Sequence, residues 1–109
     1  MNDHTAIAAG RWLKQLGCQA SIITRGADGC VVVGDKTMCL SARPVKVVDT
    51  TAAGDAFNGA LAAAIARDNA LDMAARWANI AAAISVTRPG AQPSLPRLSE
   101  IKTEWEKAK

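Results

Sequence analysis

The stretch Val47-Val48-Asp49-Thr50-Thr51-Ala52-Ala53-Gly54-Asp55-Ala56-Phe57-Asn58-Gly59 decides the fold, because it joins a β-branched run to a helix with little side-chain bulk between them. The run over 45–48 predicts a strand that ends at Asp49, and apolar residues recur at helical spacing from Phe57 to Ile65. The first helical turn falls near residues 53–55. Its free N–H groups carry the positive end of the helix dipole, and alanine and glycine let an anion approach them. The sequence therefore predicts a backbone anion site here.

Two carboxylates, Asp49 and Asp55, flank this loop. An aspartate in the first turn of a helix is a good capping residue, and that is one interpretation of Asp55. The other is chemical: beside an anion site, an ionised carboxylate can accept the proton of a hydroxyl that attacks a phosphoryl group, while N–H groups and Mg²⁺ stabilise the charge. The pattern alone leaves both alternatives open.

Length and composition indicate one domain with an unusual core. The chain has 109 residues, half of them hydrophobic, but only 4% are aromatic. Alanine occupies many positions where a larger apolar residue is common, so close packing between helices is expected to build the core.

The charge balance argues against nucleic acid as a partner. The net charge is +3 and the pI is near 9.0, yet basic residues are spread along the chain and interleaved with acids. The only local cluster, at the C-terminus, is broken by Glu104 and Glu106, which is typical of a solvated helix face. The small positive excess is compatible with binding nucleotide phosphates.

The cysteines Cys18, Cys30 and Cys39 are odd in number and lack metal-ligand spacing. We expect free, buried thiols in a reducing compartment. With neither a signal peptide nor a run of apolar residues long enough to span a bilayer, the expectation is a cytoplasmic protein without a membrane partner.

Periodicity and turn residues predict an α/β chain. Asp3 or Thr5 is expected to cap the first helix, Gly17 to stop it, and Ser99 to cap the last. Gly59, in the second turn of its helix, costs about 1 kcal/mol relative to alanine and hints at close approach by another backbone or a ligand. The apolar face of the first helix comprises Ile7, Ala8, Trp12, Leu13 and Leu16. The predicted elements are a helix over 3–17, strands over 20–24, 30–33 and 37–40, and helices over 53–67, 71–86 and 99–108.

Three motifs carry a resemblance to a known family: Asp49 to Gly59, Ile23-Thr24-Arg25-Gly26-Ala27-Asp28-Gly29, and Ala81 to Ser94. In this order they resemble the ribokinase-like (PfkB) family of carbohydrate kinases, which phosphorylate sugar or nucleoside hydroxyls with ATP. The third motif is similar to the ending of the ribokinase subfamily. The resemblance covers nearly the whole chain and implies the C-terminal part of a three-layer α/β/α fold with a β-hairpin, further strands and about four helices.

The resemblance assigns roles to the small-residue loop. It implies that Asp55 is the general base and that the N–H groups of Ala53, Gly54 and Asp55 form the anion hole. Asn79 would border the adenine, although a satisfied amide in the core is an equal alternative. The nucleotide contacts implied by the resemblance are Thr24, Gly26, Gly29, Gly54 and Asn79.

The loop over 87–96 is rich in glycine and proline and presents carbonyl oxygens, which suit a hard cation. Taken alone, it is an ordinary loop between helices. The resemblance implies a monovalent cation, usually K⁺, beside the anion hole, and Mg²⁺ accompanying ATP. The cation ligands that it implies, several through backbone carbonyls, are Asp49, Thr51, Ser85, Arg88, Gly90 and Ser94.

The family's sugar-binding half, its lid and an acidic motif have no counterpart in this sequence. Residues 1–109 are therefore expected to be the C-terminal nucleotide-binding and catalytic part of a longer kinase, as an excised fragment or a truncated product. Uncovered sheet edges and helix faces favour association into a homo-oligomer, a dimer. The function implied is ATP-dependent phosphorylation of a sugar, ribose to ribose 5-phosphate. The alternative is a non-catalytic nucleotide-binding remnant, or a fragment that needs the missing N-terminal half.

Overall fold

The computed structural model describes residues 2–107, so Ala108 of the predicted last helix lies outside them. The described chain holds four α-helices and three strands and is therefore α/β, as predicted. It divides into two compact units, Met1–Ala42 and Arg43–Lys109, which are described in turn.

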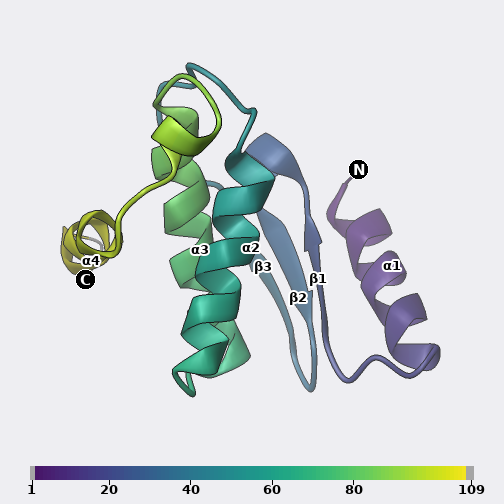
Figure 1. Cartoon of the computed structure of the whole chain (residues 1–109). Helices are drawn as coiled ribbons and strands as arrows, with labels where there is room; N and C mark the ends of the chain where they lie inside the picture. The colour runs from purple at the N-terminus through teal and green to yellow at the C-terminus, as the bar shows by residue number, and fades with distance from the viewer. Residues whose placement is uncertain (1, 108–109) are drawn as a thin grey trace. The chain divides into compact units, whose positions relative to one another are not determined.

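The first unit is built on a three-stranded antiparallel sheet in the order β1-β2-β3, comprising β1 (Ser21–Thr24), β2 (Cys30–Val33) and β3 (Thr37–Leu40) (Figure 1). Val31 of the central strand lies opposite Ile23 on one side and Cys39 on the other. A 3₁₀ turn, η1 (Gly26–Asp28), joins β1 to β2, and residues 34–36 join β2 to β3. All three strands were predicted, and the first begins one residue later than expected.

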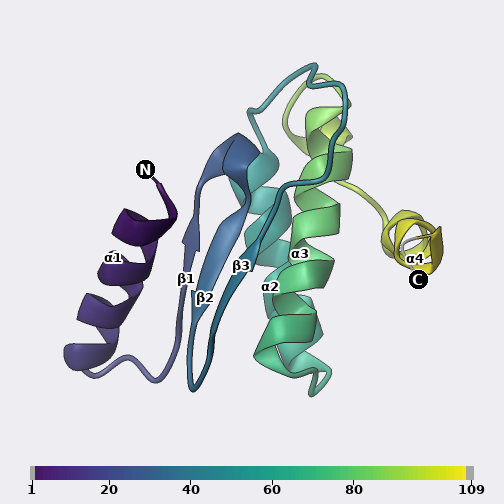
Figure 2. The same cartoon turned by 180° about the vertical axis from the view of Figure 1, so that it is seen from behind.

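Helix α1 (Asp3–Gln15) covers one face of this sheet, as Figures 1 and 2 show from opposite sides. Ala6 packs in a buried cluster with Val31 and Val33. At Gly10 the helix comes so close that an added Cβ would lie 2.5 Å from Cγ2 of Val33. Small residues at positions 6 and 10 thus set the distance between helix and sheet.

Two expectations about α1 are wrong. Its N-cap is Asn2, whose Oδ1 accepts a 2.8 Å hydrogen bond from the Thr5 N–H, whereas neither Asp3 nor Thr5 caps the helix. Asp3 instead pairs with Arg25 at 2.7 Å. The predicted apolar face is only partly buried: Ile7 packs against the cluster and Leu13 is half-buried, whereas Trp12 is 60% and Leu16 65% exposed.

The thiols are free, but only one is buried. Cys30 is inaccessible in β2, whereas Cys18 and Cys39 are exposed, which corrects the expectation of three buried thiols. Burial raises the pKa of the Cys30 thiol, and the nearby positive charge of Arg25 partly offsets that effect.

The second unit is helical. Helices α2 (Ala53–Ala66) and α3 (Leu71–Val86) lie side by side and run in opposite directions, joined by a short turn (Figure 1). A second 3₁₀ turn, η2 (Gln92–Ser94), precedes α4 (Leu98–Lys107), which packs on α3 through a cluster that includes Ile80, Ala81 and Ile101. These three helices confirm the prediction.

Two details of this unit differ from expectation. Residues 45–48 form no strand, and Val47 and Val48 are more than half exposed, because no neighbouring strand of the described chain pairs with them. Ser99 does not cap α4, since it lies inside the first turn. The carboxylate of Glu100 instead accepts a 2.9 Å hydrogen bond from the Arg97 N–H.

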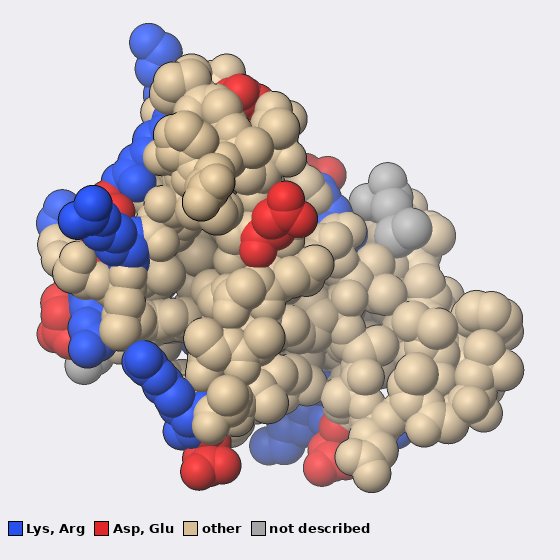
Figure 3. Space-filling model, viewed as in Figure 1, with Lys and Arg blue, Asp and Glu red and all other residues tan. Residues whose placement is uncertain are grey.

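Surface charge is mixed on the face seen in Figure 3, where basic and acidic side chains are interleaved. Among residues 2–107, no helix is both long enough and apolar enough to cross a membrane.

Candidate active site

The start of α2 leaves backbone donors free. Ala52 occupies the N-cap position and supplies no side-chain acceptor. The N–H of Ala53 donates to the Thr50 carbonyl at 3.2 Å and that of Ala56 to the Ala52 carbonyl at 2.9 Å. In the described part of the chain, the N–H groups of Gly54 and Asp55 have no acceptor. These two donors, at the positive end of a 14-residue helix, can receive an anion.

Gly54 has open space where a side chain would stand, because an added Cβ would meet no atom within 4 Å. The absence of a side chain at this position therefore has no packing reason within the described residues. It leaves the backbone of the first turn open to a ligand.

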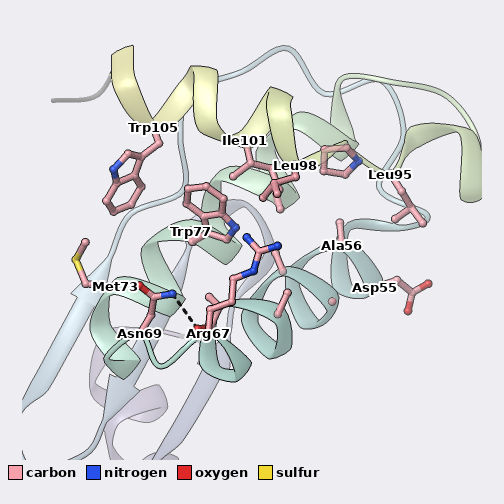
Figure 4. A pocket seen from close by; sticks show the side chains of 16 residues that line it. Asp55, Ala56, Arg67, Asn69, Met73, Trp77, Leu95, Leu98, Ile101 and Trp105 are labelled. Atoms are coloured by element: carbon pink, nitrogen blue, oxygen red, sulfur yellow. Dashed lines mark hydrogen bonds between the residues drawn. The ribbon is translucent and has the colours of Figure 1, made fainter.

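Asp55 is exposed, and its carboxylate has no hydrogen-bond or ion-pair partner among residues 2–107. A capping carboxylate would accept a bond from an N–H group of the first turn, and Asp55 accepts none. The side chain therefore remains available to a ligand, and Figure 4 shows it at one end of a pocket beside α2.

Asp49 holds two loops together. Its Oδ1 accepts hydrogen bonds from the Thr51 N–H, at 2.9 Å, and from the Thr51 hydroxyl, while Oδ2 accepts from the Gly90 N–H at 2.9 Å. These bonds stabilise the ionised carboxylate and lower the pKa of Asp49 from its ordinary value, with the Thr51 hydroxyl the largest cause. The carboxylate thus joins the loop before α2 to the loop after α3.

Further contacts fix the loop after α3. The hydroxyls of Ser85 and Ser94, both buried, lie 3.2 Å apart, and Ser94 also donates to the Ala91 carbonyl at 2.6 Å. The Arg88 guanidinium forms an ion pair with Glu100 of α4, with a second bond of 3.2 Å.

The structure therefore brings the predicted cation ligands into two bonded groups. Asp49, Thr51 and Gly90 form one, and Ser85 and Ser94 form the other. The Arg88 guanidinium, being cationic and paired with Glu100, is unsuited to bind a cation, so only its carbonyl oxygen could serve.

The predicted nucleotide loop belongs to the first unit. Thr24 is the exposed last residue of β1, and the Arg25 N–H donates to the Gly29 carbonyl at 2.7 Å. Gly29 has φ of +93°, and an added Cβ would collide with the Leu40 carbonyl, so the fold itself requires glycine there. Around Gly26 there is open space. Gly29 is therefore required by the turn, whereas Gly26 leaves open space beside it.

Asn79 is half-buried in the middle of α3. This position is compatible with both interpretations, a contact to adenine and a satisfied amide in the core. The sequence did not point to the pocket beside α2, which Trp77, Trp105 and Arg67 help to line (Figure 4). The only signal for it was a group of apolar residues, Met73, Leu95 and Leu98, that the helix periodicities did not place in the core.

Free backbone donors at a helix start, an unpaired carboxylate in the same turn, and a neighbouring loop rich in oxygen atoms are features that phosphoryl transfer can use. Sequence comparison gives the family. Residues 2–98 match the family described as pfkB family carbohydrate kinase, and the chain belongs to that family.

Individual proteins and solved structures that match this chain are kinases as well. Ribokinase of Haemophilus influenzae is 38% identical over 100 residues, which cover 91% of this chain and 33% of that protein. The crystal structure of ribokinase from Thermotoga maritima matches with a TM-score of 0.88 and 38% identity, over 92% of this chain and 34% of that one. Aminoimidazole riboside kinase from Salmonella enterica, complexed with aminoimidazole riboside and an ATP analogue, matches with a TM-score of 0.79 and 38% identity, over 88% and 34%. The chain thus spans about a third of the length of these relatives.

Proposed function

We propose that this chain is the nucleotide-binding and catalytic part of an ATP-dependent carbohydrate kinase that converts ribose to ribose 5-phosphate. The observation that carries the proposal is the start of α2, where two free backbone donors and the unpaired carboxylate of Asp55 occupy the same turn. Membership of the family supports the reaction class, and the names of two of the relatives support ribose.

In the proposed reaction, Asp55 takes the proton of a sugar hydroxyl as that oxygen forms a bond to the γ-phosphorus of ATP. The bond from the γ-phosphorus to the bridging oxygen breaks, and ADP leaves. The N–H groups of Gly54 and Asp55 stabilise the charge on the transferred phosphoryl group, with Ala53 holding the turn through its bond to Thr50. Thr24, Gly26, Gly29 and Asn79 are the proposed contacts to the rest of the nucleotide.

The residues near the loop after α3 fit a monovalent cation, because the groups that they offer are hard oxygen donors. Asp49 and the hydroxyls of Ser85 and Ser94 would hold K⁺ together with carbonyl oxygens of Thr51, Arg88 and Gly90. Bound there, K⁺ supplies positive charge that orders the loop beside the anion site. Mg²⁺ arrives with ATP as part of the substrate.

We further propose a cytoplasmic, dimeric protein. A reducing compartment suits the two exposed free thiols, Cys18 and Cys39. The apolar side chains of Val47 and Val48, more than half exposed, favour association.

A second candidate is a nucleotide-binding protein without transfer activity. The observation in its favour is the length of the match: about a third of each kinase is represented in this chain. Both candidates share the anion site and differ only in whether a sugar is phosphorylated.

The test measures ADP binding by calorimetry and ATP-dependent formation of ribose 5-phosphate, using the longest natural polypeptide that contains this sequence. Asp55→Asn should reduce turnover by about 10²–10⁴-fold, the usual contribution of a general base, because the amide accepts no proton. ADP affinity should stay within a few-fold. Asp35→Asn, at an exposed turn, is the matched control and should change neither quantity.

Turnover that survives Asp55→Asn would show that another group is the base. ADP binding without phosphorylation of ribose or of aminoimidazole riboside would support the second candidate. If neither ADP nor ATP bound, both candidates would fail.

A further inference from the structure

A pocket of about 550 Å³ lies wholly within the second unit, between α2, the beginning of α3 and the segment that leads into α4 (Figure 4). Its volume falls in the range of small-molecule sites, about 300–1,000 Å³. The proposed phosphoryl transfer uses only Asp55, at one end of it. The rest of the pocket has no role in that reaction.

The two long walls of the pocket differ in character. The wall on α2 is made of small residues, including Gly59, Ala60 and Ala63, and is therefore nearly flat. The opposite wall carries Trp77 and Trp105, whose ring centroids are 5.7 Å apart with the planes tilted by 56°. A flat wall facing aromatic side chains suits a planar ring better than a branched ligand.

One charged group projects into this apolar space. Arg67, at the end of α2, extends its guanidinium from the helix toward Trp77 (Figure 4). Among the described residues it has neither a hydrogen-bond acceptor nor an acidic partner. The neighbouring Asn69 is already used, because its side-chain N–H donates to the Ala64 carbonyl at 2.9 Å. Among the described residues that line the pocket, Arg67 is thus the one positively charged group, and its donors are unused.

The two ends of the pocket have opposite charge, with Asp55 at the start of α2 and Arg67 at its end. An anionic ligand group would be repelled by the carboxylate and attracted by the guanidinium. Guanidinium groups bind carboxylate and phosphate oxygens with two parallel hydrogen bonds. The charges therefore fix the direction in which an elongated ligand lies.

We propose that this pocket binds a small planar aromatic molecule that carries a carboxylate or phosphate group. The ring lies between the flat face of α2 and the two tryptophans, and the anionic group pairs with Arg67. This site is separate from the backbone donors of Gly54 and Asp55, so its occupation needs no nucleotide.

Calorimetry on the full 109-residue chain, without nucleotide, tests the proposal with three probes: 2-naphthoate, 2-naphthyl phosphate and the uncharged 2-naphthamide. Both anions should bind more tightly than the amide. Arg67→Gln should weaken the anions about tenfold, a change of about 1.4 kcal/mol, and leave the amide within twofold. Arg11→Gln removes the same charge from the exposed surface of α1 and should change nothing.

A second variant tests whether the probes bind inside the pocket, because it fills part of the pocket with a side chain. Gly59 lines the pocket, and an added Cβ there meets no atom within 4 Å, so the longer side chain of Gly59→Leu should occupy space in the pocket and abolish binding of all three probes. Gly59→Ala, with a shorter side chain, should retain most of it. Far-UV circular dichroism of each variant reports whether the helices are intact.

Failure of all three probes to bind at millimolar concentration would overturn the proposal. So would binding that is insensitive to both Arg67→Gln and Gly59→Leu. If Arg67→Gln weakens the binding of both anions equally, the proposal holds. The affinities of the two anions for the parent protein then show whether the site prefers carboxylate or phosphate. None of these outcomes depends on whether the chain binds ATP.

Discussion

At the scale of single residues, the carboxylate of Asp49 connects two loops. One of its oxygens accepts a hydrogen bond from Thr51 and the other accepts one from Gly90. These bonds lower its pKa in the folded protein. A carboxyl group with a depressed pKa stabilises the fold above its unfolded pKa, near 3.9, and this contribution is lost as the pH falls through the folded value.

Asp49→Asn should therefore lower the melting temperature at neutral pH, because the amide N–H₂ cannot accept the bond from Gly90. The difference between the parent and Asp49→Asn should stay constant above about pH 5 and shrink below about pH 4. Thermal unfolding followed by circular dichroism between pH 2 and pH 7 measures both. Asp35→Asn, with no such bonds, should show no pH-dependent difference.

Gly54 offers a second prediction at this scale. Because a Cβ there would meet no atom within 4 Å, Gly54→Val should leave the melting temperature unchanged or raise it. The added methyl groups would cover the backbone donors, so ADP affinity should fall at least tenfold, as measured by calorimetry. Equal ADP affinity in the variant and the parent would place the phosphates elsewhere.

The local structure around single residues was predictable from the sequence where a motif fixed it, and less so where several candidates stood together. The small-residue loop and its two aspartates were found because their spacing is specific. The N-cap of α1 was missed, because Asn2, Asp3 and Thr5 are all good capping residues and only the geometry selects Asn2. The binding and catalytic roles of the site residues stay predictions.

At the scale of elements, two glycines in helices should respond to the same substitution with opposite sign. Gly10 of α1 lies against Val33, and the Cβ of alanine would be 2.5 Å from Cγ2 of that valine. Gly59 of α2 has no neighbour within 4 Å of its missing Cβ. Alanine is better than glycine by about 1 kcal/mol in a helix, and overpacking costs about 1–3 kcal/mol.

Gly59→Ala should therefore raise the free energy of unfolding by about 1 kcal/mol. Gly10→Ala should lower it by up to about 2 kcal/mol, because the clash outweighs the gain in helix propensity. Urea denaturation of the two variants and the parent measures both changes in the free energy of unfolding. A gain in stability in both variants would show that α1 can move away from the sheet.

The helices and hairpin strands were predictable because their apolar periodicity and turn residues are local properties. The strand predicted over 45–48 was not found, although its residues have high β propensity. A strand needs neighbouring strands to satisfy its backbone groups, and none of the described strands pairs with it. Propensity describes the segment alone, whereas pairing depends on the rest of the molecule.

At the scale of the whole molecule, the two units meet in the sequence at a segment without helix or strand, residues 41–52. Within it Lys46 is exposed, and Arg43 precedes a proline, which blocks trypsin at that bond. Limited digestion should therefore cut first after Lys46, giving fragments 1–46 and 47–109 by mass spectrometry. First cleavage inside α3, at Arg76, would show that this helix opens before the connecting segment is cut.

The carbonyl of Val86, the last residue of α3, accepts hydrogen bonds from the N–H groups of both Val48 and Asp49, at 2.7 and 3.1 Å. Each residue added to a helix turns its end by about 100° and moves it about 1.5 Å. A single-residue insertion or deletion within α3 would therefore point this carbonyl away from the segment that leads into α2, and no side-chain change could restore the contact. Insertions in the turn between α2 and α3 leave it in place. The length of α3, rather than its composition, is thus the property under the tightest constraint, and natural variation in length should collect at residues 67–70.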